Sequence, residues 1–184
     1  MPTPKISDQE LIARITRVFQ DHGFEGTSLS AISEATGLEK ASLYHRFPGG
    51  KEQMAEAALG HVAKCFVNTL LAPLRESGPA LVRVRETARR LQAFYETGER
   101  SCLLDTLSLP GGGAALHKAI EGTYEAWIDA FIAFAKESGF SPGQARRRAE
   151  DAVIGIHGSL ILARATGKTK PFVRMIRRLP ALLG

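Results

Sequence analysis

The sequence predicts an all-α fold of about nine helices. Apolar residues recur at helical spacing through most of the chain, strand-like alternation is almost absent, and capping residues stand where helices would begin and end. With 44% apolar and 23% charged residues, the composition is that of an ordinary globular protein. No apolar run is long enough to span a membrane and the amino terminus lacks a signal-peptide core, so a cytoplasmic protein is expected.

The first three helices follow from capping and turn residues. A capping box, with Ser7 three positions before a glutamate, starts the first helix, and Gly23 favours its end. A second short helix is expected at about residues 28–36, after which Gly37 suits a left-handed turn. The third helix covers residues 40–47 and stops at a proline followed by two glycines.

Proline and glycine also divide the rest of the chain into helices. The strongest start signal is Ser141-Pro142-Gly143-Gln144, which combines an N-cap serine, proline at the first helical position and glutamine three residues on. The remaining helices are expected at residues 51–75 with an interruption near Pro73, 79–95, 102–109, 114–137, 142–166 and 169–182.

The helix at residues 40–47 has two different faces. Leu43 and Phe47 are four residues apart and fall on the apolar face. The opposite face presents small or hydrogen-bonding side chains, namely Ala41, Ser42 and His45, flanked by Lys40 and Tyr44. After a short helix and a tight glycine turn, this pattern indicates a helix-turn-helix, whose small residues would let the helix approach base edges in a major groove. The alternative is a helical corner within a larger bundle.

Residues 27–54 resemble the DNA-binding signature of the TetR family of bacterial helix-turn-helix transcriptional regulators. The resemblance rests on Thr27, Ile32, Ala35, Gly37, Leu38, Leu43, Tyr44, His45, Phe47 and Lys51-Glu52. It implies a three-helix DNA-binding domain at residues 1–50 and a helical effector-binding and dimerisation domain at residues 51–184.

The resemblance also implies which side chains face DNA. Together with Ala41, which the small-residue pattern selects, these are Thr27, Ser28, Lys40, Ser42, Tyr44, His45 and Lys51. Residues 1–60 hold six Lys and Arg against eight Asp and Glu, although the whole chain carries a net charge of +5. Phosphate binding would therefore depend on locally placed cations and not on the bulk charge of this domain.

The last two helices are expected to form a dimer seam, as the family resemblance implies. Small residues spaced by four would permit close helix approach, and the final helix carries an apolar stripe. The candidate residues are Gly155, Ser159, Leu162, Ala163, Phe172, Ile176 and Leu179. The alternative is that both faces pack inside one subunit.

The middle helices provide candidates for a largely apolar effector cavity. Aromatic and aliphatic side chains with a few polar groups are typical of ligand sites, although at helical spacing they are also typical of a core. The candidates are His61, Cys65, Phe66, Phe94, Tyr95, Leu103, Leu107, Tyr124, Trp127 and Phe131. The expected effector is a small hydrophobic or aromatic molecule, and neither a cofactor nor a metal is predicted.

The two cysteines leave other functions open. Cys102 or Cys65 would serve a thiol-redox-sensing repressor, and either, with His61, would serve an all-helical thiol-dependent enzyme. No nucleophile, base and orienting group occur in a recognisable spacing, so an enzyme is not expected. A DNA-binding dimer without an effector is a further alternative. The favoured interpretation is a homodimeric repressor that a small hydrophobic or aromatic effector releases from a palindromic operator.

Overall fold

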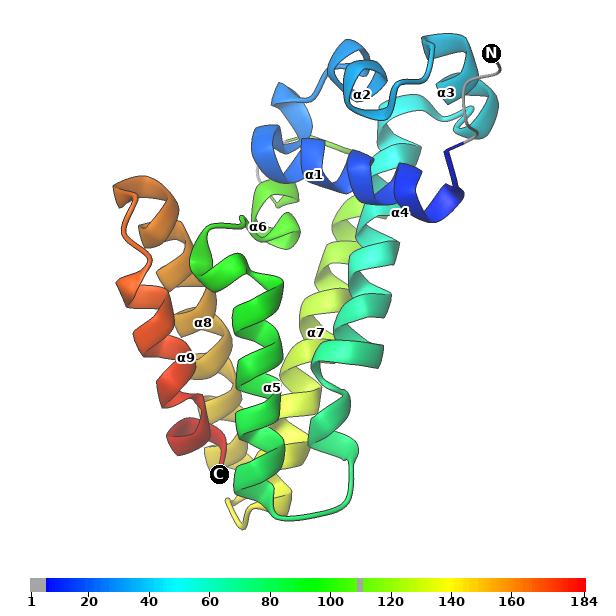
Figure 1. Cartoon of the computed structure of the whole chain (residues 1–184). Helices are drawn as coiled ribbons and strands as arrows, with labels where there is room; N and C mark the ends of the chain where they lie inside the picture. Colours follow the sequence, from blue (N-terminus) through cyan, green and yellow to red (C-terminus); the bar gives the residue numbers. More distant parts are fainter. Residues whose placement is uncertain (1–5, 109–110) are drawn as a thin grey trace. The chain divides into compact units, whose positions relative to one another are not determined.

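The computed structural model describes residues 6–108 and 111–184, and over these ranges it contains nine α-helices and no β-strand (Figure 1). The predicted all-α class is confirmed. Contacts divide the chain into two compact units, one running to Ala63 and including Leu103–Glu121, the other comprising Lys64–Cys102 and Gly122–Gly184. None of the described helices is long and apolar enough to cross a membrane.

The first unit is built on α1 (Asp8–Gly26). The Ser7 hydroxyl accepts a hydrogen bond from the Glu10 N–H at 3.2 Å, which is the serine half of the predicted capping box, while the Glu10 carboxylate accepts from Arg14. The backbone leaves helical geometry at Gly23 (φ 68°), where an end was predicted, and resumes for a short final stretch. Helix α2 (Leu29–Thr36) and helix α6 (Leu103–Leu107) both pack on α1. Besides residues of the expected DNA-binding domain, this unit includes most of the fourth helix and, from a distant part of the sequence, α6.

The second unit contains α5 (Ala80–Phe94), α8 (Pro142–Thr166), α9 (Lys170–Leu183) and most of α7 (Ala114–Glu137). Helices α8 and α9 lie side by side, and α5 packs on α9 (Figure 1). The predicted capping box of α8 is formed, because Ser141 and Gln144 each accept a hydrogen bond from the other's backbone N–H. Gly167 ends α8 in the left-handed conformation, as its position predicts.

Helix α4 (Gly50–Cys65) is shorter than the predicted helix 51–75. It is followed by a π-helical turn, η1 (Phe66–Leu70), and a 3₁₀ turn, η2 (Ala72–Arg75). Pro73 has no N–H, so it cannot donate to the Thr69 carbonyl as a continuing α-helix would require. The Arg90 guanidinium on α5 donates to that carbonyl instead, at 2.7 Å. A side chain from another helix therefore satisfies the carbonyl that proline leaves unpaired.

A buried arginine joins three elements at one end of the second unit. Arg83 on α5 is 7% exposed and donates to the Glu76 carbonyl at 2.7 Å and to the Glu137 carboxylate on α7 at 2.9 Å. Its guanidinium also lies 5.0 Å from the centre of the Phe134 ring. The hydrogen bond from Arg83 lowers the pKa of the Glu137 carboxyl.

A second acidic group on α5 gives the fold an expected dependence on acid. Hydrogen bonds from Arg89 and then Arg90 lower the pKa of Glu86 from 4.5 to about 2. Because this pKa is depressed in the folded state, its stabilisation is present above pH 4.5 and is lost as the pH falls toward 2. We expect thermal unfolding followed by circular dichroism to show less loss of stability across this window for Glu86→Gln than for the wild type. Glu125→Gln, an exposed change on α7, is the matched control, and equal slopes for Glu86→Gln and the wild type would contradict the assignment.

Candidate nucleic-acid interface and ligand site

The turn between α2 and α3 (Lys40–Arg46) is held by local hydrogen bonds. The Ser28 hydroxyl caps α2 by accepting from the Ala31 N–H at 3.1 Å. Gly37 takes the left-handed conformation (φ 71°), and its N–H donates to the Ser33 carbonyl at 2.9 Å. The Ser33 hydroxyl then donates across the turn to the Leu38 carbonyl at 2.6 Å. These contacts fix the direction in which α3 leaves the turn.

Helix α3 divides into a buried side and an exposed side, as predicted. Leu43 is fully buried and Phe47 is 9% exposed, in the same unit as the fully buried Ile32. The exposed residues of α3 are Lys40, Ala41, Ser42, Tyr44 and His45. Tyr44 keeps 47% of its surface in solvent although its ring is large and apolar. The five side chains proposed to meet DNA on this helix are therefore all available to a partner.

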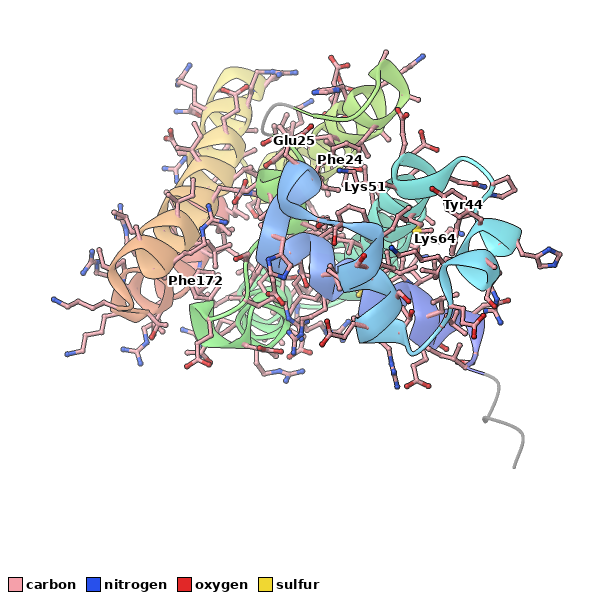
Figure 2. The ribbon with its side chains drawn as sticks, turned by 90° about the horizontal axis from the view of Figure 1, so that it is seen from above. Phe24, Glu25, Tyr44, Lys51, Lys64 and Phe172 are labelled. Atoms are coloured by element: carbon pink, nitrogen blue, oxygen red, sulfur yellow. The ribbon has the colours of Figure 1, made fainter. Side chains whose placement is uncertain are left out.

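The three predicted contacts outside α3 are placed differently. Thr27 is 2% exposed, and its hydroxyl donates to the Gly23 carbonyl at 2.6 Å, so it does not present a donor on the surface. Ser28 is exposed, but its hydroxyl serves the N-cap of α2. Lys51 is half-buried, with its ammonium 3.0 Å from the Phe24 carbonyl and 4.4 Å from the centre of that ring (Figure 2).

Six of the ten ligand-site candidates come together in the second unit. Phe66 lies at the centre, with ring centroids 5.3 Å from Phe94, 6.3 Å from Tyr95 and 4.6 Å from Trp127. The rings of Trp127 and Phe131 are 6.0 Å apart. His157 connects the sixth residue, because its ring lies 5.1 Å from Tyr124 and 5.0 Å from Trp127. We call these residues the aromatic cluster: Phe66, Phe94, Tyr95, Tyr124, Trp127, Phe131 and His157.

The other four candidates are not part of this cluster of rings. His61, Leu103 and Leu107 belong to the first unit, where the two leucines are buried on α6. Cys65 is half-buried at the end of α4. The structure also adds Phe172, whose ring lies 5.8 Å from Tyr95. The apolar stripe of the last helix predicts a dimer contact for Phe172. No pattern in the sequence indicates its contact with the Tyr95 ring.

Among the described residues, the buried side-chain atoms of the second unit that lack hydrogen-bond partners include one on Trp127 and one on Thr87. Trp127 is 1% exposed and its indole Nε1 has no acceptor, while the Thr87 hydroxyl on α5 is fully buried without a partner. An unsatisfied buried donor costs about 1–3 kcal/mol. The Tyr95 hydroxyl, by contrast, lies 3.4 Å from the Cys102 sulfur. The interior of this unit thus contains polar groups without hydrogen-bond partners, and one of them, the Trp127 N–H, lies within the aromatic cluster.

Both thiols are free, and neither stands exposed on the surface. Cys102 is 2% exposed, and Cys65 is intermediate. Reactive cysteines are accessible and lie in electropositive surroundings. The burial of Cys102 therefore gives the redox-sensing alternative no support.

Most of the predicted dimer residues are buried within the subunit itself. Phe172, Ile176 and Leu179 are at most 2% exposed, and Ser159 and Ala163 are buried on α8. Gly155 lies against the side chain of Met175, which a side chain at position 155 would have to displace. Leu162 alone of the seven stays exposed, at 52%, and the structure adds Ile154 at 67% and Ile161 at 47%. The apolar stripe of α9 serves internal packing because α9 packs on both α8 and α5.

Comparison with known proteins identifies both parts of the chain. Residues 11–58 match the family of bacterial regulatory proteins described as the tetR family. Residues 80–178, more than half of the chain, match the C-terminal domain described as transcriptional regulator LmrA/YxaF-like. The HTH-type transcriptional regulator LmrA of Bacillus subtilis is 28% identical over 188 aligned residues, which cover 96% of each chain. The HTH-type transcriptional repressor AcnR of Corynebacterium efficiens is 37% identical over 51 residues, or 28% of this chain and 27% of that protein.

Solved structures show the same fold. A TetR transcriptional regulator from Legionella pneumophila superposes with a TM-score of 0.84 at 17% identity, covering 99% of this chain and 100% of that one. A cysteine mutant of the TetR family regulator CifR, complexed with 26-bp double-strand operator DNA, gives a TM-score of 0.77 at 23% identity over 98% of both chains. The chain therefore belongs to the TetR family of bacterial DNA-binding transcriptional regulators, with a C-terminal domain of the LmrA/YxaF-like kind.

Proposed function

We propose that this regulator is a homodimeric repressor that binds a palindromic operator and is released by a small apolar or aromatic effector. Because its target is genomic DNA, we place it in the cytoplasm. The observation that carries the proposal is the exposed side of α3, where the small residues Ala41 and Ser42 stand among longer hydrogen-bonding side chains. A helix with this surface fits a major groove closely.

The exposed residues of α3 divide into two roles. Ala41 and Ser42 have side chains short enough for the helix backbone to approach base edges. Lys40, Tyr44 and His45 stand around them with donors that suit phosphate oxygens, which set register without reading sequence. Lys51 would join them only by leaving the Phe24 carbonyl, and Thr27 supports the fold and not the contact.

Selection of bound fragments from the source genome tests the operator proposal. We expect the wild type to recover a palindromic site that a Lys40→Ala/Tyr44→Ala variant fails to recover. Both replaced side chains are exposed, so the fold should be unchanged. A Leu81→Ala/Arg85→Ala variant, altered on the exposed surface of α5, should recover the same site as the wild type. Weak, salt-sensitive and sequence-independent binding by all three proteins would contradict the proposal.

The proposed dimer uses the exposed apolar side of α8. Ile154, Ile161 and Leu162 are spaced to lie along one side of the helix, and each keeps about half or more of its surface in solvent. Leu162 also lines, together with Gly158, a shallow groove of about 260 Å³ between α8 and α9. Two copies related by a two-fold axis would cover these side chains and present two α3 helices to successive half-sites, roughly 34–36 Å apart.

Leu162→Asp is expected to separate the dimer into folded monomers. The new carboxylate would be buried without a partner on association, so the dimer dissociation constant should rise about a hundredfold or more. Sedimentation velocity across a concentration series measures this change. Leu81→Asp is the matched control, because Leu81 is 48% exposed on α5 and Leu162 is 52% exposed on α8. Equal dissociation constants for the two variants would place the dimer contact elsewhere.

The proposed effector site is the aromatic cluster. Its rings offer apolar contact, and the Trp127 indole N–H supplies a donor without an acceptor. An effector with an aromatic or apolar body and one acceptor oxygen would therefore gain a hydrogen bond at little cost in desolvation. Release from DNA additionally requires that the effector bind more tightly to a conformation with lower operator affinity. Quenching of the fluorescence of Trp127, the single tryptophan of the chain, would report occupancy.

A further inference from the structure

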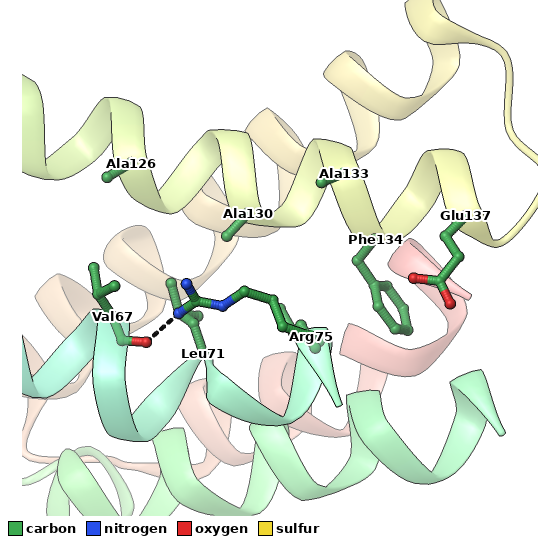
Figure 3. A pocket seen from close by; sticks show the side chains of 9 residues that line it. Val67, Leu71, Arg75, Ala126, Ala130, Ala133, Phe134 and Glu137 are labelled. Carbon is green, nitrogen blue, oxygen red and sulfur yellow. Dashed lines mark hydrogen bonds between the residues drawn. The ribbon is translucent and has the colours of Figure 1, made fainter. Parts of the chain in front are cut away.

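A second candidate ligand site in the second unit is lined by residues that do not belong to the aromatic cluster. It is a groove of about 430 Å³ between the η1–η2 segment and α7 (Figure 3). Val67 and Leu71 form part of one wall, and Ala126, Ala130 and Ala133 form the facing surface of α7. The three alanines are spaced by four and three residues, so they share one side of α7 and leave it smooth. The groove is thus apolar over most of its length and falls within the size range of small-molecule sites.

Arg75 supplies a cation to this groove. Figure 3 shows its side chain running along the groove toward Val67, whose backbone carbonyl accepts a hydrogen bond from the guanidinium. Arg75 is exposed, and over residues 6–108 and 111–184 no carboxylate forms an ion pair with it. A guanidinium has five N–H donors, so the bond to Val67 leaves the others able to grip an anion.

The π-helical turn explains why Arg75 is held in this position. In a regular α-helix the Leu71 N–H would donate to the Val67 carbonyl. Here the Leu71 N–H donates to the Phe66 carbonyl at 2.9 Å, so the Val67 carbonyl loses its helical donor and takes the guanidinium. The cation is therefore positioned by backbone geometry before any ligand arrives, which lowers the entropy that binding would cost.

The acidic residue at the end of the groove does not cancel this charge. Glu137 is paired with the buried Arg83 at 2.9 Å, which lowers the pKa of the Glu137 carboxyl. Its negative charge is thereby already balanced by a cation outside the groove lining. An incoming anion meets the Arg75 guanidinium together with an apolar surface, and a neutral apolar molecule would leave the guanidinium without an anionic partner.

We propose that this groove binds an amphipathic organic carboxylate. The carboxylate would accept two hydrogen bonds from the Arg75 guanidinium, and the apolar body would lie against Leu71 and the alanines of α7. The proposal goes beyond the effector site above and does not rest on it, because none of the residues that line the groove belongs to the aromatic cluster. It gives the regulator a second small-molecule input of a different chemical class.

Octanoate, titrated into the full-length protein by calorimetry, is the probe for this site. We expect saturable binding to the wild type, and at least tenfold weaker binding to Arg75→Gln, since a bidentate charged contact is lost. Octanol, which keeps the apolar chain but lacks the charge, should also bind at least tenfold more weakly. Arg85→Gln, which removes an exposed arginine from α5, should bind octanoate like the wild type.

Two further results decide between sites. Trp127→Phe should keep the octanoate affinity of the wild type if the groove is the site, whereas a loss in this variant would move octanoate to the aromatic cluster and overturn the proposal. Ala130→Leu, which narrows the groove without removing charge, should weaken octanoate binding while circular dichroism shows an unchanged fold. Absence of saturable binding to the wild type at millimolar octanoate, or equal affinity for wild type and Arg75→Gln, would also overturn it.

Discussion

Ala41→Glu is expected to lower operator affinity by about a hundredfold or more without changing the helical content. Ala41 is exposed at the centre of the small-residue surface of α3, and glutamate is a good helix former, so the fold should tolerate it. On DNA, the longer side chain would hold the helix away from the base edges, and its charge would face the phosphates. Placing like charges together in an interface costs several kcal/mol, and about 2.8 kcal/mol corresponds to a hundredfold change.

Ala93→Glu provides the comparison for this result. Ala93 is exposed on α5, so the variant carries the same change in charge and size at a helical surface that the proposed contact does not include. Fluorescence anisotropy with the recovered operator should give wild-type affinity for Ala93→Glu and the large loss for Ala41→Glu. Equal affinities for the two variants would mean that α3 does not enter the groove.

Trp127→Ala is expected to have the largest effect on stability, lowering the free energy of unfolding by about 4 kcal/mol. The indole is 1% exposed and contacts the rings of Phe66, Phe131 and His157, so its removal would leave a cavity in the second unit. For a chain of this length the unfolding temperature should fall by roughly 8–16 °C. Circular dichroism at a fixed protein concentration is the measurement, because the variant has no tryptophan to fluoresce.

Trp127→Phe separates the ring from its N–H. Phenylalanine keeps an aromatic ring in the cluster but removes the indole N–H that lacks an acceptor. Because an unsatisfied buried donor costs about 1–3 kcal/mol, losing it should offset much of the lost packing. We expect Trp127→Phe to stay within about 1 kcal/mol of the wild type. A loss as large as that of Trp127→Ala would indicate that the N–H is satisfied in solution.

Local signals predicted the parts of the fold that depend on neighbouring residues. The capping box at Ser141, the left-handed Gly37 and the buried Leu43 each follow from chemistry within a few positions, and each is present. The family assignment is confirmed for the same reason, because the DNA-binding signature is a compact local pattern. Membership of this family of transcriptional regulators confirms the prediction that the protein is not an enzyme.

The features that the sequence did not reveal depend on distant residues. After Cys65 the regular α-helix ends, and the Thr69 carbonyl accepts from Arg90 on α5, a contact between elements that local patterns do not indicate. The burial of Phe172 depends on Tyr95, which lies far from it in the sequence. Helical periodicity shows that a residue has an apolar side, but it cannot say whether that side meets its own subunit or a second copy.

The separation of roles along α3 bears on how such a regulator changes its target. The residues that anchor the helix, Leu43 and Phe47, point inward, and the Ser33 bond fixes the turn from outside the helix. The exposed residues Ala41 and Ser42 do not take part in this packing, so substitutions at these two positions should leave it unchanged. Under the proposed groove contact, a randomised library at these two positions is expected to yield variants with new operator preferences at nearly constant thermostability.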